Sequence, residues 1–183
     1  MIRIISGTHK GRRIQAPKQL PVRPTTDRAK ESLFNILNHR IDWGESSVLD
    51  LFSGTGNISY EFASRGSKNV VAVDAHPACT AFIHRTANAL ELPIQVVKQD
   101  VGFYLDRNRQ SFDVIFCDPP YAITAEELQD LVTQCLTGGH LKPDGVLIVE
   151  HFKQIDLSGI TGFQEARRYG QSVFSFFEVE IEK

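Results

Sequence analysis

The chain has 183 residues, of which 42% are hydrophobic and 23% are charged, which is the composition of an ordinary soluble globular domain. No apolar run approaches the length of a membrane span and the N-terminus lacks a secretory apolar core, so we expect a cytoplasmic protein without a membrane partner. The three cysteines are widely spaced and lie apart from clustered histidines, which argues against a disulfide framework and a zinc site. We therefore expect a monomer with buried free thiols and no metal.

The net charge of −2 conceals a strong asymmetry along the chain. Residues 1–40 contain nine Lys and Arg residues against two acidic ones, so they carry +7, and the remaining 143 residues carry −9. This density of positive charge can neutralise several phosphates of a polyanion, although a solvated basic face would show the same composition.

Residues 1–40 are predicted to form a small extension to the main domain. Residues 2–5 and 12–16 are predicted as two short strands around a turn-rich loop. Three prolines between positions 17 and 24 keep the chain extended up to a helix, which Thr26 or Asp27 can cap and which runs to about His39.

Short apolar strands and amphipathic helices alternate in the rest of the chain, residues 41–183. Strands are predicted at residues 48–51, 69–73, 94–98, 112–117 and 146–150, and helices at residues 57–64, 77–90, 101–107 and 125–136. This order predicts a doubly wound, mostly parallel sheet. Residues 164–168 and 172–181 flank a tight turn and predict an antiparallel hairpin. The fold class is therefore α/β, with a seven-stranded Rossmann-like sheet.

A glycine-containing loop follows the first strand of this series. Gly54 and Gly56 allow the backbone to turn tightly and to approach a ligand at the start of a helix, where free N–H groups gather. Asp50 precedes the loop, and Ser59 stands where a dinucleotide-binding fingerprint has its third glycine. An additional carboxylate fits a ligand with an ammonium or sulfonium charge better than a pyrophosphate.

Further acidic residues follow the next strands. Asp74 lies eighteen residues after Gly56, close to the spacing at which an acid binds a ribose diol. Asp100 follows the third strand, where it can accept a hydrogen bond from an adenine amine. Each acid alone is more often a helix cap or a solvated surface group, but acids at four successive strand ends, with Asp118 as the fourth, predict a nucleoside-binding cleft.

A rigid acidic motif follows the strand predicted at residues 112–117. It consists of Asp118, Pro119, Pro120 and Tyr121, and it lies at a carboxyl strand end, where open α/β sheets place their chemistry. The prolines remove two backbone donors, so the loop offers acceptors beside a flat ring. Such a loop fits a planar amine, although a rigid turn with a packed tyrosine would also explain the motif alone.

These motifs resemble those of the class I S-adenosylmethionine-dependent methyltransferases. In that superfamily a motif like Asp118-Pro119-Pro120-Tyr121 belongs to enzymes that methylate exocyclic amines, mostly of nucleobases. The stretches at residues 3–7, 10–12 and 23–35 are similar to the signature of the bacterial 16S rRNA guanine-N2 methyltransferases of the RsmD type. The resemblance covers nearly the whole chain.

The resemblance implies a reaction, a cofactor and three sets of residues. A methyl group of S-adenosylmethionine would pass to the 2-amino group of one guanine in 16S rRNA, as free RNA or within the small ribosomal subunit. The implied catalytic residues are Asp118, Pro119, Pro120 and Tyr121. The implied cofactor-binding residues are Asp50, Phe52, Ser53, Gly54, Thr55, Gly56, Asp74, Asp100, Val101 and Asp118. The implied RNA-binding residues are Arg3, His9, Lys10, Arg12, Arg13, Arg23, Thr25, Arg28 and Lys30.

Three other functions are compatible with parts of the sequence. The proline motif alone equally suits an adenine-N6 methyltransferase of DNA or RNA, but the chain has no room for a separate target-recognition domain. A non-catalytic RNA-binding assembly factor would not need the intact glycine loop and proline motif. A nicotinamide-dependent oxidoreductase is disfavoured by Ser59 and by the four acids of the cleft.

Overall fold

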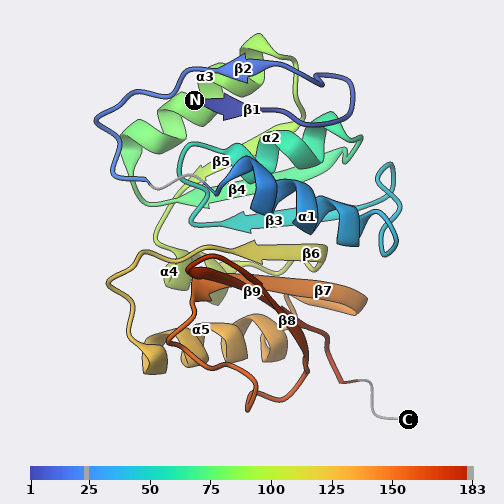
Figure 1. Cartoon of the computed structure of the whole chain (residues 1–183), viewed down its shortest axis with the longest axis vertical. Helices are drawn as coiled ribbons and strands as arrows, with labels where there is room; N and C mark the ends of the chain where they lie inside the picture. The colour runs from blue at the N-terminus through green and yellow to red at the C-terminus, as the bar shows by residue number, and fades with distance from the viewer. Residues whose placement is uncertain (23–24, 181–183) are drawn as a thin grey trace.

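A seven-stranded mixed sheet forms the centre of the molecule in the computed structural model, which describes residues 1–22 and 25–180 (Figure 1). The strand order is β5-β4-β3-β6-β7-β9-β8. The strands are β3 (Ser47–Leu51), β4 (Asn69–Asp74), β5 (Ile94–Lys98), β6 (Phe112–Cys117), β7 (Leu141–Phe152), β8 (Phe163–Tyr169) and β9 (Ser172–Phe177). The first five are parallel, and β9 pairs antiparallel with both β7 and β8. The predicted α/β fold class is therefore confirmed.

The order of the parallel strands reverses between β3 and β6. The chain builds outward from β3 to β4 and β5, and then returns to place β6 on the other side of β3. Ligands of open α/β sheets bind at such a reversal, outside the carboxyl ends of the strands. All five residues of β3 are buried, as expected for a central strand with both faces covered.

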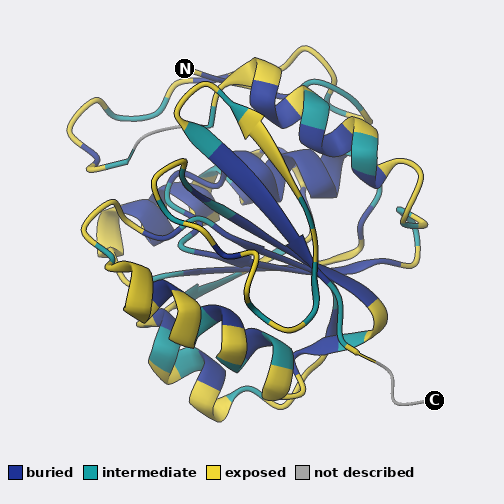
Figure 2. Ribbon diagram, turned by 60° about the horizontal axis from the view of Figure 1, so that its bottom comes forward, coloured by how far each residue is buried: buried dark blue, intermediate teal, exposed yellow. Residues whose placement is uncertain are grey.

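Helices cover both faces of the sheet (Figures 1 and 2). On one face α1 (Asp27–Leu37), α2 (Asn57–Ser64) and α3 (Pro77–Ala89) pack into one apolar core, and on the other α4 (Val101–Arg107) and α5 (Ala125–Thr137) pack into a second. Figure 2 shows that α1 and α5 are buried where they face the sheet and exposed on their outer surfaces, whereas all residues of α2 are buried. Within the residues that the structure describes, no helix has the length and apolarity needed to cross a bilayer.

Residues 1–40 share the core of the main domain. The short strands β1 (Ile2–Arg3) and β2 (Arg13–Ile14) pair antiparallel and contribute Ile2, Ile4 and Ile14 to the same apolar core as α1, α2 and α3. The hairpin loop contacts the end of α2, where a Cβ on Gly7 would lie only 1.8 Å from the Ser64 carbonyl oxygen. Gly7 also has a φ of +88°, so both its conformation and its close approach require glycine.

Element boundaries differ from the predictions mainly at β7 and β9. β7 begins at Leu141 instead of residue 146, and its register with β6 shifts opposite Pro143, Asp144 and Gly145. A strand next to a register irregularity tolerates such residues. β9 ends at Phe177, and residue 181, where its end was predicted, lies outside the described residues.

Candidate active site

A cavity of about 700 Å³ lies at the carboxyl ends of the parallel strands, where the strand order reverses. This volume falls within the usual range for small-molecule sites. All four residues of the proline motif line it, namely Asp118, Pro119, Pro120 and Tyr121. The residues predicted to bind the cofactor also line it, except Gly56: they are Asp50, Phe52, Ser53, Gly54, Thr55, Asp74, Asp100, Val101 and Asp118.

The glycine loop between β3 and α2 has a left-handed backbone at three positions. The φ angles are 57° at Phe52, 54° at Gly54 and 85° at Gly56, which caps the N-terminus of α2. A Cβ on Gly56 would lie 2.7 Å from the Tyr60 ring, so no other residue fits there. The Gly54 N–H donates to the Asp74 carboxylate at 2.8 Å. Gly56 therefore packs against Tyr60 of α2, whereas Gly54 lines the cavity.

Asp50 is the most deeply buried acid of the cavity, with 2% of its surface exposed. The Ser59 hydroxyl donates to its Oδ2 at 2.5 Å. Burial raises the pKa of Asp50 to about 7, the Ser59 hydrogen bond opposes this rise, and the negative charge of Asp74 adds to it. Ser59, which replaces the third glycine of a dinucleotide fingerprint, thus supports an acid in the cavity wall.

Asp74 and Asp100 hold backbone N–H groups as well as lining the cavity. Asp74 accepts from the Gly54 N–H and, through Oδ1, from the His76 N–H at 2.8 Å. Asp100 caps α4 by accepting from the Phe103 N–H at 3.0 Å and is exposed, while Val101 beside it is buried. The capping and ligand-facing interpretations of these acids are therefore compatible, because one carboxylate accepts several hydrogen bonds.

The proline motif leaves β6 beside the glycine loop, and the Asp118 N–H lies 3.4 Å from the Leu51 carbonyl oxygen of β3. The Tyr121 ring stacks on Phe152 of β7, with centroids 4.1 Å apart and planes inclined by 24°. Tyr121 remains half exposed, so the pair forms an aromatic wall of the cavity. Burial raises the pKa of Cys117 well above its usual value, so this neighbouring thiol stays protonated at neutral pH.

Part of the N-terminal extension forms a further wall of the cavity, which the sequence analysis did not predict. Thr25, expected to bind RNA, donates from Oγ1 to Glu150 of β7 at 2.9 Å, and its carbonyl oxygen accepts from Asn57 Nδ2 at 3.3 Å. Glu150 and Phe152 were also missed. The rule that identified Asp50 and Asp118, an important side chain at a carboxyl strand end, applies to Glu150 as well.

The hairpin of β1 and β2 lies beside α3 (Figure 1), and several basic residues of the extension are exposed. Lys10, Arg12, Arg13 and Arg28 are exposed, and Arg12 and Arg13 line a shallow pocket with Arg85 of α3. The sequence analysis missed Arg85 because it lies far from the basic segment in sequence.

Two other residues expected to bind RNA have different surroundings. Arg3 pairs with Asp27 at 3.0 Å and remains half exposed. His9 is half-buried, and its N–H donates to the Ser64 hydroxyl at 3.0 Å. Arg23 lies outside the described residues.

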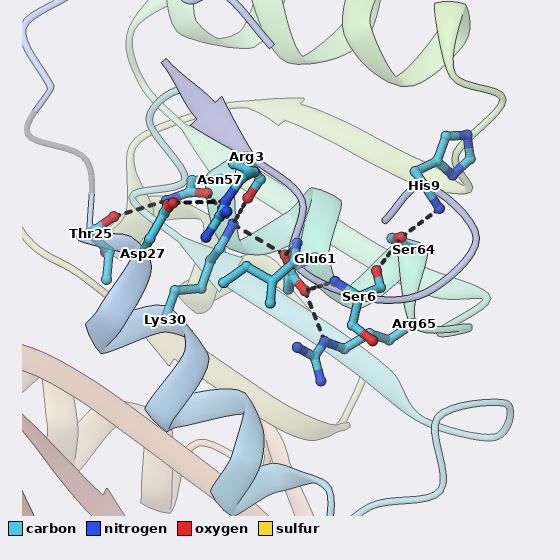
Figure 3. Close-up of polar contacts among 11 residues, drawn as sticks. Arg3, Ser6, His9, Thr25, Asp27, Lys30, Asn57, Glu61, Ser64 and Arg65 are labelled. Atoms are coloured by element: carbon cyan, nitrogen blue, oxygen red, sulfur yellow. Dashed lines mark hydrogen bonds and ion pairs between the residues drawn. The ribbon is translucent and has the colours of Figure 1, made fainter. Parts of the chain in front are cut away.

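Lys30 cannot have the predicted role in RNA binding, because its side chain is fully buried. Its Nζ lies 3.1 Å from Glu61 Oε2 and donates to Asn57 Oδ1 at 2.9 Å and to the Arg3 carbonyl oxygen (Figure 3). Glu61 also pairs with Arg65 at 2.9 Å. Lys30 therefore fixes α1 and β1 to α2, and its assignment to the RNA surface is corrected.

The cavity fits the S-adenosylmethionine that the sequence resemblance implies. Five acids line its described part, Asp50, Asp74, Asp100, Asp118 and Glu150, and no Lys or Arg does. This charge favours a ligand that carries sulfonium and ammonium groups. Among the described residues, no group of three or more His, Cys, Asp or Glu side chains is arranged to hold a metal ion.

Comparison with known proteins identifies close relatives. The family model described as "Conserved hypothetical protein 95" matches residues 2–178. The Bacillus subtilis protein named "Putative rRNA methyltransferase YlbH" is 34% identical over 88% of each chain. Ribosomal RNA small subunit methyltransferase D of Haemophilus influenzae is 30% identical over 81% of this chain and 78% of its own. The structure of the Escherichia coli protein yhhF superposes with a TM-score of 0.87 over 99% of both chains at 23% identity, which shows a shared fold.

Proposed function

This chain belongs to the family that matches residues 2–178, the RsmD family of S-adenosylmethionine-dependent methyltransferases, and we propose that it methylates the 2-amino group of a guanine in 16S rRNA. The observation that carries the proposal is the meeting of two loops at one cavity. The glycine loop after β3 and the Asp118 loop after β6 leave adjacent strands and line the same space. A methyl donor on the first loop and an amine on the second would therefore be in contact.

The donor side of the cavity is formed by acids that suit a nucleoside with a positively charged side chain. S-adenosylmethionine supplies an electrophilic methyl group, so the protein's main task is alignment. Asp50 faces the ammonium of the methionine moiety, Asp74 the ribose hydroxyls and Asp100 the adenine amine. The Gly54 N–H already holds Asp74 at the loop, which pre-organises the ribose site.

The acceptor side must improve a poor nucleophile, because the 2-amino lone pair of guanine is delocalised into the ring. Hydrogen bonds from this amine to the Asp118 carboxylate and to the Pro119 carbonyl favour a pyramidal nitrogen and stabilise its developing positive charge. As the N–C bond forms and the S–C bond breaks, the nitrogen loses one proton. Asp118 either accepts this proton or orients the amine while water accepts it.

The aromatic pair of Tyr121 and Phe152 would orient the ring of the target base. Tyr121 stacks on the target base on one side and on Phe152 on the other, with its position set by the 4.1 Å stacking contact. Stacking on an aromatic side chain contributes roughly 1–3 kcal/mol per base in single-stranded nucleic-acid binding. A base within a duplex would first have to be flipped out.

The exposed basic residues supply the contact with the RNA backbone. Arg12, Arg13 and Arg85 line one surface of the hairpin and α3, and Lys10 is exposed in the hairpin loop. None of these four residues forms an ion pair with another described residue. Such cations release counterions when they bind phosphates, which strengthens association at low salt.

The decisive experiment is identification of the methylated nucleoside. The protein is incubated with labelled S-adenosylmethionine and either deproteinised rRNA or small subunits from a strain that lacks the enzyme, and the product is digested and analysed by mass spectrometry. We expect N2-methylguanosine. N6-methyladenosine would establish the adenine-N6 alternative, and binding of S-adenosylmethionine without transfer to either substrate would indicate a non-catalytic factor.

A further inference from the structure

The strand register brings Glu150 close to the Asp118 loop, and both residues line the same cavity. β6 and β7 are parallel, with Phe116 opposite Ile148 and Cys117 opposite Val149. Glu150 is the residue of β7 after Val149, and Asp118 is the first residue of the loop after β6, so continuing the register brings these two positions next to each other. Phe116 and Ile148 belong to the same apolar core, and side chains alternate along a strand, so Asp118 and Glu150 follow them on that same face. Both acids line the cavity.

A specific hydrogen bond orients the Glu150 side chain. Thr25 Oγ1 donates to Glu150 Oε2 at 2.9 Å, and Asn57 Nδ2 in turn donates to the Thr25 carbonyl oxygen at 3.3 Å. This hydrogen bond joins β7 to the segment that precedes α1, and it fixes the position of the Glu150 carboxylate in the cavity wall. A carboxylate offers about four acceptor positions, so the bond from Thr25 is compatible with further hydrogen bonds to Glu150.

We infer that Glu150 is a specificity residue that accepts a hydrogen bond from N1–H of the target guanine. Guanine presents N1–H directly beside its 2-amino group, so its edge offers adjacent donors. Two adjacent acids, one for the amine and one for N1–H, match this pattern. The inference rests on the proposed function and deepens it by assigning the choice of base to a residue.

The same arrangement disfavours adenine. Adenine presents an N1 lone pair beside its 6-amino group, so a carboxylate at this position would face a second acceptor and the two would repel each other. A site built to bind a donor rejects an analogue without it strongly, because buried polar groups are left unpaired. The proline motif alone fits the amine of either base, and Glu150 would explain why guanine is the base that is methylated.

The test compares guanine with 2-aminopurine, which keeps the 2-amino group but has a lone pair at N1. The target nucleotide is first mapped with the wild-type enzyme, and 16S rRNA is then assembled with guanine or 2-aminopurine at that position. We expect the wild-type enzyme to prefer guanine in kcat/KM by about 10–100-fold, as for one hydrogen bond to a charged group. Glu150→Gln should narrow this ratio at least tenfold, because the amide N–H can donate to N1 of 2-aminopurine. Glu45→Gln, an exposed substitution in the loop before β3, should leave the ratio unchanged.

The outcomes separate this inference from the proposed function. If the wild-type product is not N2-methylguanosine, the proposed function fails. If that product forms but Glu150→Gln retains the wild-type preference for guanine, the inference is overturned and the function stands. Should Glu150→Gln not fold, the wild-type enzyme alone decides, because a preference for guanine below about threefold contradicts the inference. Thr25→Val, which removes the orienting hydroxyl and keeps the carboxylate, should narrow the ratio by a smaller factor.

Discussion

The Lys30 ammonium lies 3.1 Å from the Glu61 carboxylate, and neither side chain is exposed to solvent. Removing one partner of a buried ion pair leaves an uncompensated charge, which typically costs about 3–5 kcal/mol. Because Arg65 also pairs with Glu61, we expect Lys30→Met to lower the free energy of unfolding by about 2–4 kcal/mol. Urea denaturation at neutral pH measures this change.

A double variant tests whether the loss arises from the unpaired charge. Lys30→Met combined with Glu61→Gln should be less destabilised than the sum of the two single variants, because no charge is then left without its partner. An additive result would assign the loss to packing. The salt dependence of RNA binding should be unchanged in Lys30→Met, since the buried ammonium contacts no phosphate.

The acids at the strand ends are the part of the site that the sequence predicts best. The rule that chemistry lies at the carboxyl ends of parallel strands was enough to bring Asp50, Asp74, Asp100 and Asp118 to one cavity. The basic residues of the N-terminal segment were harder to predict. Charge alone did not distinguish buried Lys30 from its exposed basic neighbours, because its burial depends on which face of α1 contacts Glu61 of α2. Long-range pairs of this kind leave no local pattern in the sequence.

Asp118→Ala should abolish methyl transfer and leave S-adenosylmethionine binding close to that of the wild type. The carboxylate lies in the loop that faces the acceptor amine, so its loss removes the charge that stabilises the reacting nitrogen, an effect of at least about 100-fold in kcat. Single-turnover transfer and calorimetric titration with the donor measure the two properties. Full activity in this variant would contradict the assignment of the loop to the amine.

Asp50 should make donor binding depend on pH. Its pKa is raised to about 7 mainly by burial, so between about pH 6 and about pH 8 the group passes from neutral to ionised. The ionised form attracts the ammonium of the donor, so affinity should rise with pH across this window. In Asp50→Asn the affinity should be lower and flat. Ser59→Ala should move the midpoint upward, because the Ser59 hydrogen bond stabilises the ionised form.

The same residue should destabilise the donor-free protein at higher pH. An unfolded aspartate ionises near pH 4, whereas folded Asp50 keeps its proton up to about pH 7, so the unfolding free energy falls as pH rises between these values. The penalty is on the order of 4 kcal/mol above this window. Asp50→Asn should therefore be more stable than the wild type at pH 8 and similar at pH 4. Thermal unfolding at both pH values checks this, and equal shifts at both would exclude ionisation as the cause.

Arg12 and Arg13 should account for part of the salt dependence of RNA binding. Both are exposed beside Arg85, and each phosphate contact contributes about 0.7–0.9 to the slope of log affinity against log salt. Replacing Arg12 and Arg13 together by alanine should weaken binding and flatten the slope by roughly 1.4–1.8, and adding Arg85→Ala should flatten it further.

A matched control replaces Arg107 and Arg109, which are also exposed but belong to α4 and the loop after it, on the opposite face of the sheet. Binding is measured by filter retention between 50 and about 200 mM salt, the range over which such contacts lose most affinity. An unchanged slope in the Arg12 and Arg13 variant, or an equal change in the control, would show that the RNA backbone lies elsewhere.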